Sequence, residues 1–358
     1  MMARKTILVL SYVPPYNRQG YDLCEALREE GYGVTLFQKD GKTEKKKGIF
    51  GIKCMEPHGK FHKFQTIWNM LKFALRTAWV SKDIVICVGK PILPLGGFYS
   101  LFFGSSLIWY SLEYSRLGAI DRFVYRHCVK GYIDVEENRR NAIFTQYGEK
   151  NATTICHNMP HLHVKSFCGG KLRKYLKEQY GIADNAKLVM YAGSYQRYAC
   201  LEKIVEASKS FPNNCVLVLM AFGLPKHLIE STNCIVVPPV KGEEFYEWLS
   251  DADCALLPYE SMTDFNVMNC SPQKLFDCYL AGVPFVASNR PIVRQTLGYA
   301  PQVGVLCDFT DEKAIVAAIR NILGRKAVVG DEMKRLHREE FNYGRVMGNV
   351  LDVVKSVL

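Results

Sequence analysis

A short segment between Ser271 and Gly282 holds side chains whose types and spacing suit an anionic ligand. Ser271 suits a helix N-cap, Pro272 suits the first helical position, and Gly282 suits the position after the last turn. On such a helix, Lys274 and Asp277 lie one turn apart, on the side away from the apolar residues. A helix N-terminus attracts negative charge, so a cation near it indicates an anion-binding site.

The ordinary interpretation of Lys274 and Asp277 is a solvated ion pair on a surface helix. Their neighbours on that side are Cys278 and Ala281, which a solvated face seldom carries. We therefore expect this side of the helix to face something close-fitting and anionic. Residues 283–287 follow as a short buried strand.

The string Ser-Pro-Gln-Lys-Leu-Phe-Asp, followed after three residues by Ala-Gly-Val-Pro-Phe-Val-Ala-Ser, resembles the donor-binding signature of nucleotide-sugar glycosyltransferases with the GT-B fold. It is most similar to the group 1 family, usually retaining, which builds bacterial surface polysaccharides. The resemblance implies that Asp277 holds the ribose hydroxyls of the donor. The family usually carries Glu there, and a second Glu near the sugar, where this chain has Asn269. The same resemblance assigns donor contacts to Ser271, Pro272, Lys274 and Leu275.

A second part of the resemblance lies where a predicted strand ends in Gly193 and Ser194 before a helix. Free backbone N–H groups at such a turn are a natural seat for phosphate. The family typically has Arg directly after this Gly and Lys further along, and register puts Ser194 and Ala199 there. The available cations are Arg197 and Lys274. We expect Arg197 to substitute, because a guanidinium can grip phosphate in a bidentate manner.

Two further segments complete the predicted donor site. Pro239 and Val240 match the place where the family holds the base against backbone groups. The loop before the central helix offers groups suited to a sugar at the carboxyl end of a strand, namely Asp264, Phe265 and Asn266. No acidic pair of the Asp-x-Asp type is apparent, and GT-B relatives generally need no metal. We therefore expect no metal and no cofactor, with the nucleotide-sugar as a substrate.

These residues must be positioned by alternating strands and helices, which recur in both halves of the 358-residue chain. This alternation predicts an α/β protein with two doubly wound Rossmann-like domains facing across a cleft, the GT-B arrangement. We predict an acceptor-binding domain over 1–165 and a linker over 166–186. A nucleotide-sugar-binding domain follows over 187–340, and a helix over 341–358 crosses back to the first domain.

Candidate acceptor residues lie in the first half. Glu113 follows a predicted strand, at the carboxyl end where open α/β sheets bind ligands. By position it resembles the residue that contacts the acceptor, or acts as the base in inverting relatives; a surface Glu in a loop is the alternative. In the loop after the first strand, Tyr16 and Gly20 are acceptor-binding candidates, and Gly20 matches a glycine common in the family. Glu113 and Asn269 are the catalytic candidates.

The excess charge sits in the first half of the chain. Residues 1–165 carry 24 Lys/Arg and 14 Asp/Glu, a net charge of +10, whereas residues 166–358 carry 22 and 21, a net charge of +1. A basic half can meet anionic lipid, a phosphorylated acceptor or nucleic acid. Nucleic acid is the weakest of these, because no helix-turn-helix, RNP-like or zinc-finger pattern is present.

Two apolar stretches of the first half bear on the membrane. Residues 61–80 mix tryptophan and other apolar residues with Lys and Arg. They suit either a helix in a membrane interface or a helix packed on the first sheet with a solvated basic edge. Residues 92–110 are uncharged, but Pro and Gly interrupt them, so we expect a core helix and a strand instead of a membrane span.

The sequence thus predicts a hexosyltransferase that moves a sugar from a UDP- or GDP-sugar to a saccharide acceptor. We expect a lipid-linked acceptor, retention of configuration and a role in bacterial surface polysaccharide synthesis. Two alternatives are a nucleotide-sugar 2-epimerase of the same fold and a GT-B-like binding subunit that has lost catalysis. Thirteen cysteines without a CxxC or Cys/His cluster, and no signal-peptide pattern, favour the cytoplasm. The inner face of the cytoplasmic membrane is a candidate surface for peripheral attachment.

Overall fold

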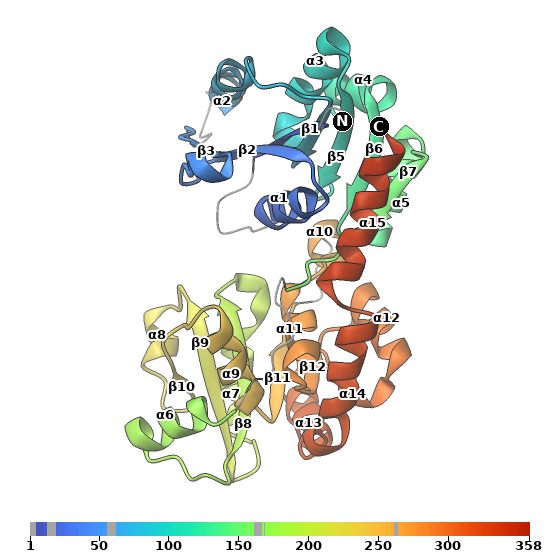
Figure 1. Ribbon diagram of the computed structural model, residues 1–358. Helices are drawn as coiled ribbons and strands as arrows, with labels where there is room; N and C mark the ends of the chain where they lie inside the picture. The colour runs from blue at the N-terminus through green and yellow to red at the C-terminus, as the bar shows by residue number, and fades with distance from the viewer. Residues whose placement is uncertain (1–4, 13–18, 56–61, 161–166, 168, 261–263) are drawn as a thin grey trace. The chain divides into compact units, whose positions relative to one another are not determined.

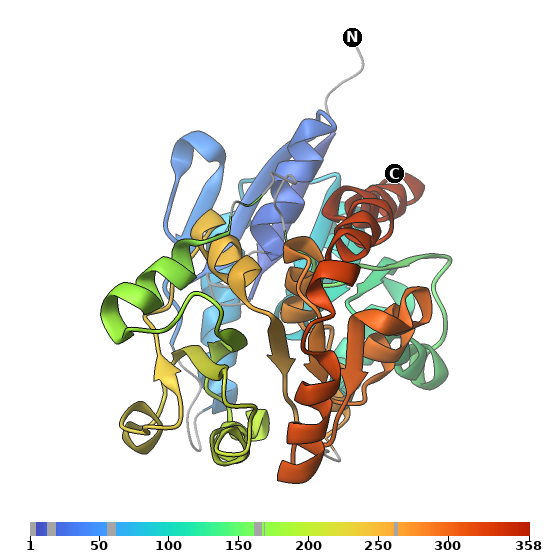
Figure 2. The ribbon, with the colours of Figure 1, turned by 90° about the horizontal axis from the view of Figure 1, so that it is seen from below.

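The computed structural model describes residues 5–12, 19–55, 62–160, 167, 169–260 and 264–358. The chain divides into two compact units, one made of residues 1–157 with 344–358 and the other of residues 158–343. In Figures 1 and 2 the first unit runs from blue to green and includes the red terminal helix, and the second runs from yellow-green to orange-red.

Within the described residues, the first unit is built on a seven-stranded parallel sheet of order β3-β2-β1-β4-β5-β6-β7. Its strands are β1 (Thr6–Ser11), β2 (Gly33–Lys39), β3 (Ile49–Ile52), β4 (Ile84–Val88), β5 (Ser106–Ser111), β6 (Val129–Asp134) and β7 (Ala152–Ile155). Its helices are α1 (Gln19–Glu29), α2 (His62–Thr77), α3 (Leu93–Phe103), α4 (Ala119–His127), α5 (Glu137–Tyr147) and α15 (Tyr343–Ser356). The central strands are continuous runs of Val, Ile and Leu, as expected when both faces of a parallel sheet are covered.

Helices α2 to α5 cover one face of this sheet. Phe73 of α2, Tyr99 of α3, Tyr125 of α4 and Ile143 of α5 belong to a single buried cluster with residues of the strands. The terminal helix α15 packs beside β6 (Figure 1), where a Cβ on Gly131 would lie 2.9 Å from a methyl group of Val353. Glycine in β6 therefore allows the last helix to approach the sheet closely.

The second unit carries a six-stranded parallel sheet of order β10-β9-β8-β11-β12-β13 in its described residues. Its strands are β8 (Lys187–Ser194), β9 (Cys215–Phe222), β10 (Ile235–Val236), β11 (Cys254–Leu257), β12 (Phe285–Ala287) and β13 (Gly304–Leu306). Its helices are α6 (Lys171–Tyr180), α7 (Leu201–Ser208), α8 (Lys226–Ile229), α9 (Glu243–Asp251), α10 (Phe265–Met268), α11 (Gln273–Ala281), α12 (Pro291–Tyr299), α13 (Glu312–Ile322) and α14 (Lys326–Glu339).

Both sheets confirm the predicted fold class of two doubly wound Rossmann-like domains. In each sheet the first strand along the chain lies inside the sheet, and the strand order reverses beside it, between β1 and β4 or between β8 and β11. Ligands of such sheets bind at this switch point, at the carboxyl ends of the strands. Residues 92–110 form α3 and β5, as predicted. Among the described helices, none combines the length and the apolar character needed to cross a membrane.

The central helix differs from its prediction at one end. α11 begins at Gln273 and its N-cap is Pro272, one residue later than the sequence pattern indicated. Gly282 ends the helix in the left-handed conformation, with φ of +68°, as expected. The sequence pattern favoured Ser271 because serine is a preferred N-cap type, but in the structure its hydroxyl and carbonyl oxygen accept hydrogen bonds from Asn158.

Candidate functional site

The N-terminus of α11 lies at the switch point of the second sheet, because α11 follows the strand β11 that neighbours β8. Asn158 fixes the residues that lead into the helix. Its side-chain amide donates to the carbonyl oxygen of Ser271 at 2.8 Å, and its backbone N–H donates to the Ser271 hydroxyl at 3.3 Å. Asn158 thus positions Ser271 just before the helix.

Lys274 of α11 lies directly against the end of β8. Its ammonium donates to the hydroxyl of Tyr191 at 3.0 Å and stands 4.1 Å from the centre of that ring. The Tyr191 hydroxyl donates in turn to the carbonyl oxygen of Ser194 at 2.7 Å. A Cβ on Gly193 would lie 2.5 Å from Cε and 2.6 Å from Nζ of Lys274. The φ of +146° at this position favours glycine, and a Cβ here would displace the end of the Lys274 side chain.

We call the group of Gly193, Ser194 and Lys274 the anion seat. It joins the turn after β8 to a lysine from the first turn of α11. Backbone N–H groups at a strand-to-helix turn and an ammonium beside them are the two components that bind phosphate in many α/β proteins. The sequence placed Gly193 and Lys274 in one site, and the structure brings them into contact.

Asp277 is 4% exposed and is therefore not part of a solvated ion pair. Its Oδ1 accepts a hydrogen bond of 2.9 Å from the hydroxyl of Tyr246, on α9. Burial raises the pKa of Asp277 to about 7, and hydrogen bonds from Tyr246 and Gln273 and the charge of Lys274 oppose this rise. The carboxyl group is therefore held at a position where ionisation is costly.

Burial also acts on the lysine. It lowers the pKa of Lys274 to about 8, while the charge of Asp277 acts in the opposite direction. An anionic partner stabilises a buried ammonium more than it stabilises an exposed ammonium, because less water competes for the buried charge. The anion seat is thus electrostatically suited to a phosphate group.

The loop before α11 is held by its own polar groups. Asp264 caps α10 by accepting the N–H of Val267 at 2.9 Å. Asn269 is 8% exposed, and its side-chain amide donates to the carbonyl oxygen of Phe265 at 3.0 Å. The neighbouring predicted residue Asn266 is half-buried. The structure therefore brings the three predicted sugar-site positions 264–266 and Asn269 into one small turn.

Arg290 organises this loop from behind. It is 1% exposed and donates to the carbonyl oxygens of Val267 and of Glu260, the latter at 3.2 Å. Its guanidinium also stands 4.6 Å from the centre of the Tyr259 ring. A buried guanidinium with several acceptors fixes the path of the chain, so Arg290 positions the loop that leads to α11.

The remaining predicted donor residues are placed as follows. Pro239 and Val240 are half-buried and follow β10, at the carboxyl edge of the sheet. Leu275 lies on the buried side of α11 and serves the core. The backbone at Arg197 forms a short 3-10 turn, and its side chain lies outside the described residues, so its predicted role stays a prediction.

The acceptor candidates belong to the first unit. Glu113 is exposed on the loop after β5, where its carbonyl oxygen accepts from the Ser111 hydroxyl at 3.2 Å. Arg139 supports this loop by donating to the carbonyl oxygen of Leu112 at 2.7 Å. A Cβ on Gly20 would lie 3.2 Å from the Ser11 hydroxyl, which gives this glycine a packing role. The predicted residue Tyr16 lies outside the described residues.

Sequence reasoning missed the side chains that hold the site residues, namely Tyr191, Tyr246, Arg290 and Arg139. Only Tyr191 left a signal, because residues two apart on a strand share a face and Tyr191 lies two before Gly193. The other three act from elements far along the chain, so no local pattern could reveal them. Within the described part of the chain, no group of three or more His, Cys, Asp and Glu residues is placed to hold a metal ion.

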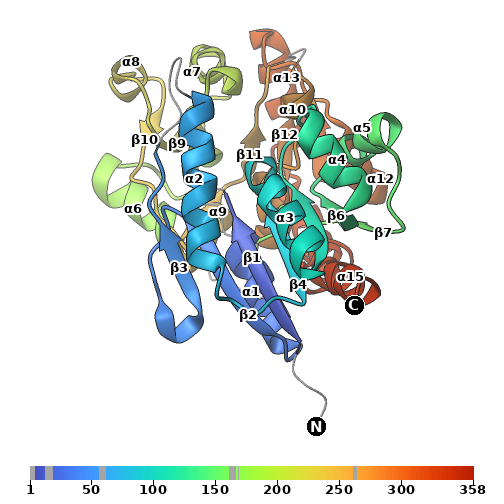
Figure 3. The ribbon, with the colours of Figure 1, turned by 90° about the horizontal axis from the view of Figure 1, so that it is seen from above.

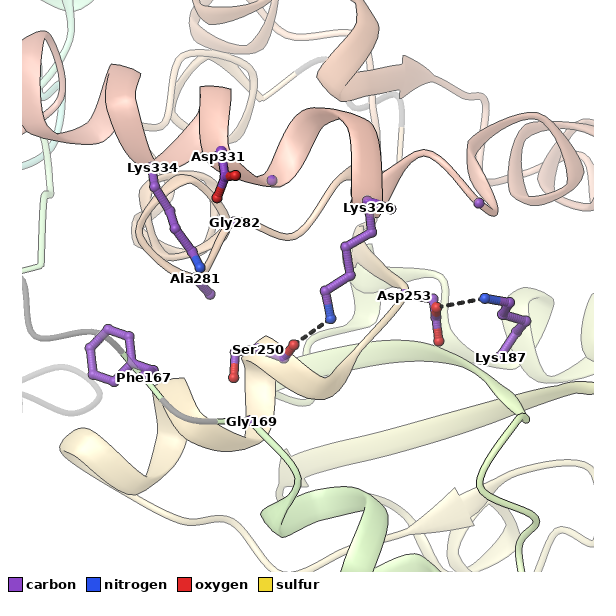
Figure 4. Close-up of a pocket in the computed structure, with 13 residues that line it drawn as sticks. Phe167, Gly169, Lys187, Ser250, Asp253, Ala281, Gly282, Lys326, Asp331 and Lys334 are labelled. Carbon is purple, nitrogen blue, oxygen red and sulfur yellow. Dashed lines mark hydrogen bonds and ion pairs between the residues drawn. The ribbon is translucent and has the colours of Figure 1, made fainter.

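A cavity of about 500 Å³ lies at the opposite end of α11 (Figure 4). Its charged lining includes Lys187, Asp253, Lys326 and Lys334. Lys187 lies 3.1 Å from Asp253, and Lys326 donates to the carbonyl oxygen of Ser250. These residues come from the amino ends of β8 and β11 and from α14. The cavity is therefore at the other edge of the sheet and separate from the anion seat.

Comparison with solved structures assigns the fold. The chain is similar to sucrose-phosphate synthase from Thermosynechococcus elongatus, with a TM-score of 0.73, 14% identity and 99% of both chains covered. It is also similar to Anabaena HepE in complex with UDP, with a TM-score of 0.72, 12% identity, and 98% of this chain and all of that chain covered. HepE has also been solved with UDP-glucose and with UDP and glucose. These similarities over the whole chain confirm the predicted GT-B fold.

A third similar structure is that of a putative UDP-N-acetylglucosamine 2-epimerase from Listeria monocytogenes. The TM-score is 0.61 at 11% identity, with 99% of this chain and 96% of that chain covered. No family model and no curated protein sequence matches the chain. At these identities the comparisons establish the fold, and the function must be argued from the site.

Proposed function

We propose that the chain is a glycosyltransferase of the hexosyltransferase type that uses a nucleoside-diphosphate sugar, UDP- or GDP-linked, as donor. The observation that carries this proposal is the anion seat, where the Lys274 ammonium lies against Gly193 at the carboxyl edge of the second sheet. A leaving diphosphate is the group that such a seat suits best. HepE, with the same fold, was solved with UDP and with UDP-glucose, which supports the choice of donor class.

Most of the predicted donor residues have a role in this proposal. Backbone groups of Gly193 and Ser194, the Lys274 ammonium and the Ser271 hydroxyl would stabilise the charge that develops on the leaving diphosphate. Arg197 would add a second cation. The Asp277 carboxylate would accept the ribose hydroxyls. Pro239 and Val240 would hold the base, and Asn269 with residues 264–266 would hold the sugar.

The proposed transfer proceeds with retention. The bond between the anomeric carbon and the diphosphate oxygen breaks, the acceptor oxygen bonds to that carbon, and the acceptor proton passes to the leaving phosphate. This transfer needs neither a protein nucleophile nor a metal ion. In an inverting reaction, Glu113 would take the acceptor proton as general base.

The acceptor in this proposal is a lipid-linked saccharide at the inner face of the cytoplasmic membrane, as in bacterial surface polysaccharide synthesis. Glu113, at the carboxyl edge of the first sheet, would contact it. The net charge of +10 on residues 1–165 supports a partner with anionic groups.

A thermal-shift screen against UDP, GDP, ADP, CMP and their sugars tests the donor site. One nucleotide should raise the melting temperature of the wild type and leave Asp277→Ala unchanged. Asp331→Ala, which removes an exposed acid elsewhere in the second unit, is the matched control and should respond like the wild type. No shift with any nucleotide would contradict the proposal and favour a binding subunit without catalysis.

The epimerase alternative has one observation in its favour, the similarity to a putative 2-epimerase. An epimerase would convert the nucleotide-sugar without any acceptor and would release an intact isomeric nucleotide-sugar. Incubation of the purified protein with the donor that the screen selects, followed by NMR of the sugar protons, separates the two reactions. A new nucleotide-sugar would support epimerisation, whereas release of free nucleoside diphosphate would support transfer to water or acceptor.

A further inference from the structure

The exposed apolar residues of this protein gather on three neighbouring helices of the first unit. Twelve large hydrophobic side chains on α2, the turn after α2, α3 and α4 are each at least about one third exposed to solvent. These are Phe64, Ile67, Trp68, Leu71, Leu75, Trp79, Phe98, Leu101, Phe102, Phe103, Ile120 and Phe123. Scattered surface hydrophobics are ordinary, but a set concentrated on adjacent elements marks an interaction surface.

The helix α2 shows why packing on the sheet does not account for this set. One side of α2 is buried, and Phe73 on that side is part of the core. The residues Phe64, Trp68 and Leu75 follow a second helical stripe on the opposite side, and Leu75 is 68% exposed. A helix that needed only one apolar side to pack on its sheet would carry polar residues here.

The end of α3 continues the same surface. Leu101, Phe102 and Phe103 are three consecutive exposed residues in the last turn, and Phe102 is 71% exposed. The helix is anchored from below, where the hydroxyls of Thr77 and Tyr99 form a hydrogen bond that links α2 to α3. The exposed last turn of α3 therefore belongs to a helix that is held in place by α2.

The three helices lie side by side over one face of the first sheet (Figure 3). We call the twelve exposed residues together the apolar face. Ile120 and Phe123 add α4 to it, next to α3. The apolar face thus spans three helices that a single flat partner could contact at once.

The charges around the apolar face are almost all positive. α2 and α3 contain no acidic residue, and Asp83 is the only acidic residue in the sequence from 57 to 112. Arg76 of α2 and Arg122 and Arg126 of α4 are exposed. The acid of α4, Asp121, lies 3.7 Å from Lys90 and so has a cation beside it.

We propose that the apolar face docks on the surface of an anionic phospholipid bilayer, with the last turn of α3 inserted among the lipids and the arginines of α2 and α4 at the headgroups. The purpose of this docking, which is to bring the first unit to a lipid-linked acceptor, rests on the proposed function. The docking itself does not. Aromatic and aliphatic side chains next to exposed Arg and Lys are the composition that binds a membrane interface. The sequence pointed to residues 61–80 alone, and the structure adds α3 and α4.

The charge pattern favours lipid over a protein partner. A second copy of the chain would bring the same basic rim against Arg76, Arg122 and Arg126, and like charges repel. An anionic bilayer complements both components of the surface, because its headgroups neutralise the arginines and its acyl boundary accepts the phenylalanines.

Vesicle co-sedimentation of the full chain tests the proposal. Vesicles of phosphatidylcholine mixed with phosphatidylglycerol should bind the protein at least about tenfold more tightly than phosphatidylcholine alone, and added salt should weaken the binding. Phe102→Glu with Phe103→Glu should lower the affinity about tenfold or more, because both side chains leave the bilayer. Arg122→Glu with Arg126→Glu should remove the preference for the anionic lipid.

Matched controls separate docking from folding and from donor binding. Val328→Glu places the same charge at an exposed apolar residue of the second unit and should bind vesicles like the wild type. The substituted residues are exposed, so melting temperatures should change by less than about 1 °C. Each variant should keep its nucleotide-dependent thermal shift, so a failure here is distinguishable from a failure of the donor site.

Two results would overturn the proposal. The first is equal binding of the wild type and of Phe102→Glu/Phe103→Glu to anionic vesicles. The second is a dimer of the wild type in analytical ultracentrifugation that the same double variant dissociates, together with no binding to vesicles, since that result assigns the apolar face to a second copy.

Discussion

Two helices of this chain depart from the usual distribution of polar and apolar residues, and they do so in opposite directions. α11 of the second unit buries a carboxylate and holds an ammonium against the end of a strand, whereas α2 of the first unit exposes phenylalanine, tryptophan and leucine. Both arrangements cost stability or solubility in the isolated protein. Residues whose burial or exposure is unfavourable in this way are expected at functional sites, where a bound ligand stabilises them. The partner that we propose is an anion for α11 and the surface of an anionic bilayer for α2.

The largest effect is expected at the anion seat. Lys274→Ala removes the cation that would face the leaving diphosphate, and we expect kcat/KM for sugar transfer to fall about a hundredfold or more. Lys334→Ala, on α14 in the cavity beside the C-terminal end of α11, is the matched control and should retain most of the activity. Equal activity of both variants in a donor-consumption assay would show that Lys274 does not serve the reaction.

The comparison of the two helices is sharpest for a pair of leucines. Leu275→Ala in α11 creates a cavity at a fully buried position and should lower the free energy of unfolding by about 2 to 5 kcal/mol. Leu75→Ala in α2, where the side chain is 68% exposed, should change it by less than about 0.5 kcal/mol. Urea unfolding measures both values. A large loss for Leu75→Ala would indicate that α2 packs against protein on its outer side.

The glycine of the anion seat gives the next effect. Gly193→Ala puts a Cβ 2.5 Å from Cε of Lys274, at a φ of +146° that favours glycine. We expect a loss of about 1 to 3 kcal/mol in the free energy of unfolding and a weaker nucleotide-dependent thermal shift. Gly223→Ala is the control, because this glycine also has a positive φ but no atom within 4 Å of its Cβ position. Its thermal shift should survive even though its backbone is strained.

The two titrating groups of α11 predict a pH optimum for donor binding. The Asp277 carboxylate forms as the pH rises past its raised pKa of about 7, and the Lys274 ammonium is lost above its lowered pKa of about 8. Donor affinity should therefore be greatest between these values and fall by up to about tenfold per pH unit on either side. Calorimetric titration with the selected nucleotide measures it. In Asp277→Asn the acidic limb should disappear and the alkaline limb remain.

The architecture could be predicted from the sequence because it depends on regular signals. Alternating apolar strands and amphipathic helices indicated two doubly wound domains, and Gly282 indicated the end of the central helix. The resemblance and the strand that ends in Gly193 placed Gly193 and Lys274 in one predicted site, and the structure brings them together. These features are local, or follow from strand order.

What the sequence could not show are contacts between distant elements. Tyr246 reaches Asp277 from α9 and Arg290 holds the loop before α11, and neither belongs to a recognisable pattern. The outer stripe of α2 raised a different difficulty. Periodicity shows two apolar sides on such a helix, but it does not tell which of them meets the sheet and whether the other is covered.

The last predicted effect concerns stability alone and tests whether Asp277 is retained for a ligand. The raised pKa of Asp277 means that the folded state holds its proton more tightly than the unfolded state does, so ionisation of this group destabilises the fold. The cost grows as the pH rises from about 4 to about 7 and is fully present above pH 7.

Asp277→Asn removes this cost while the Asn side-chain oxygen can still accept the hydrogen bond from Tyr246. The variant should therefore be more stable than the wild type by about 1 to 3 kcal/mol at pH 8, with a smaller gain at pH 5. Urea unfolding at both pH values without nucleotide measures the difference. A gain of stability in a variant that binds nucleotide more weakly would mean that the buried carboxylate serves binding at the expense of the fold. An equal difference at both pH values would show that ionisation of Asp277 carries no such cost.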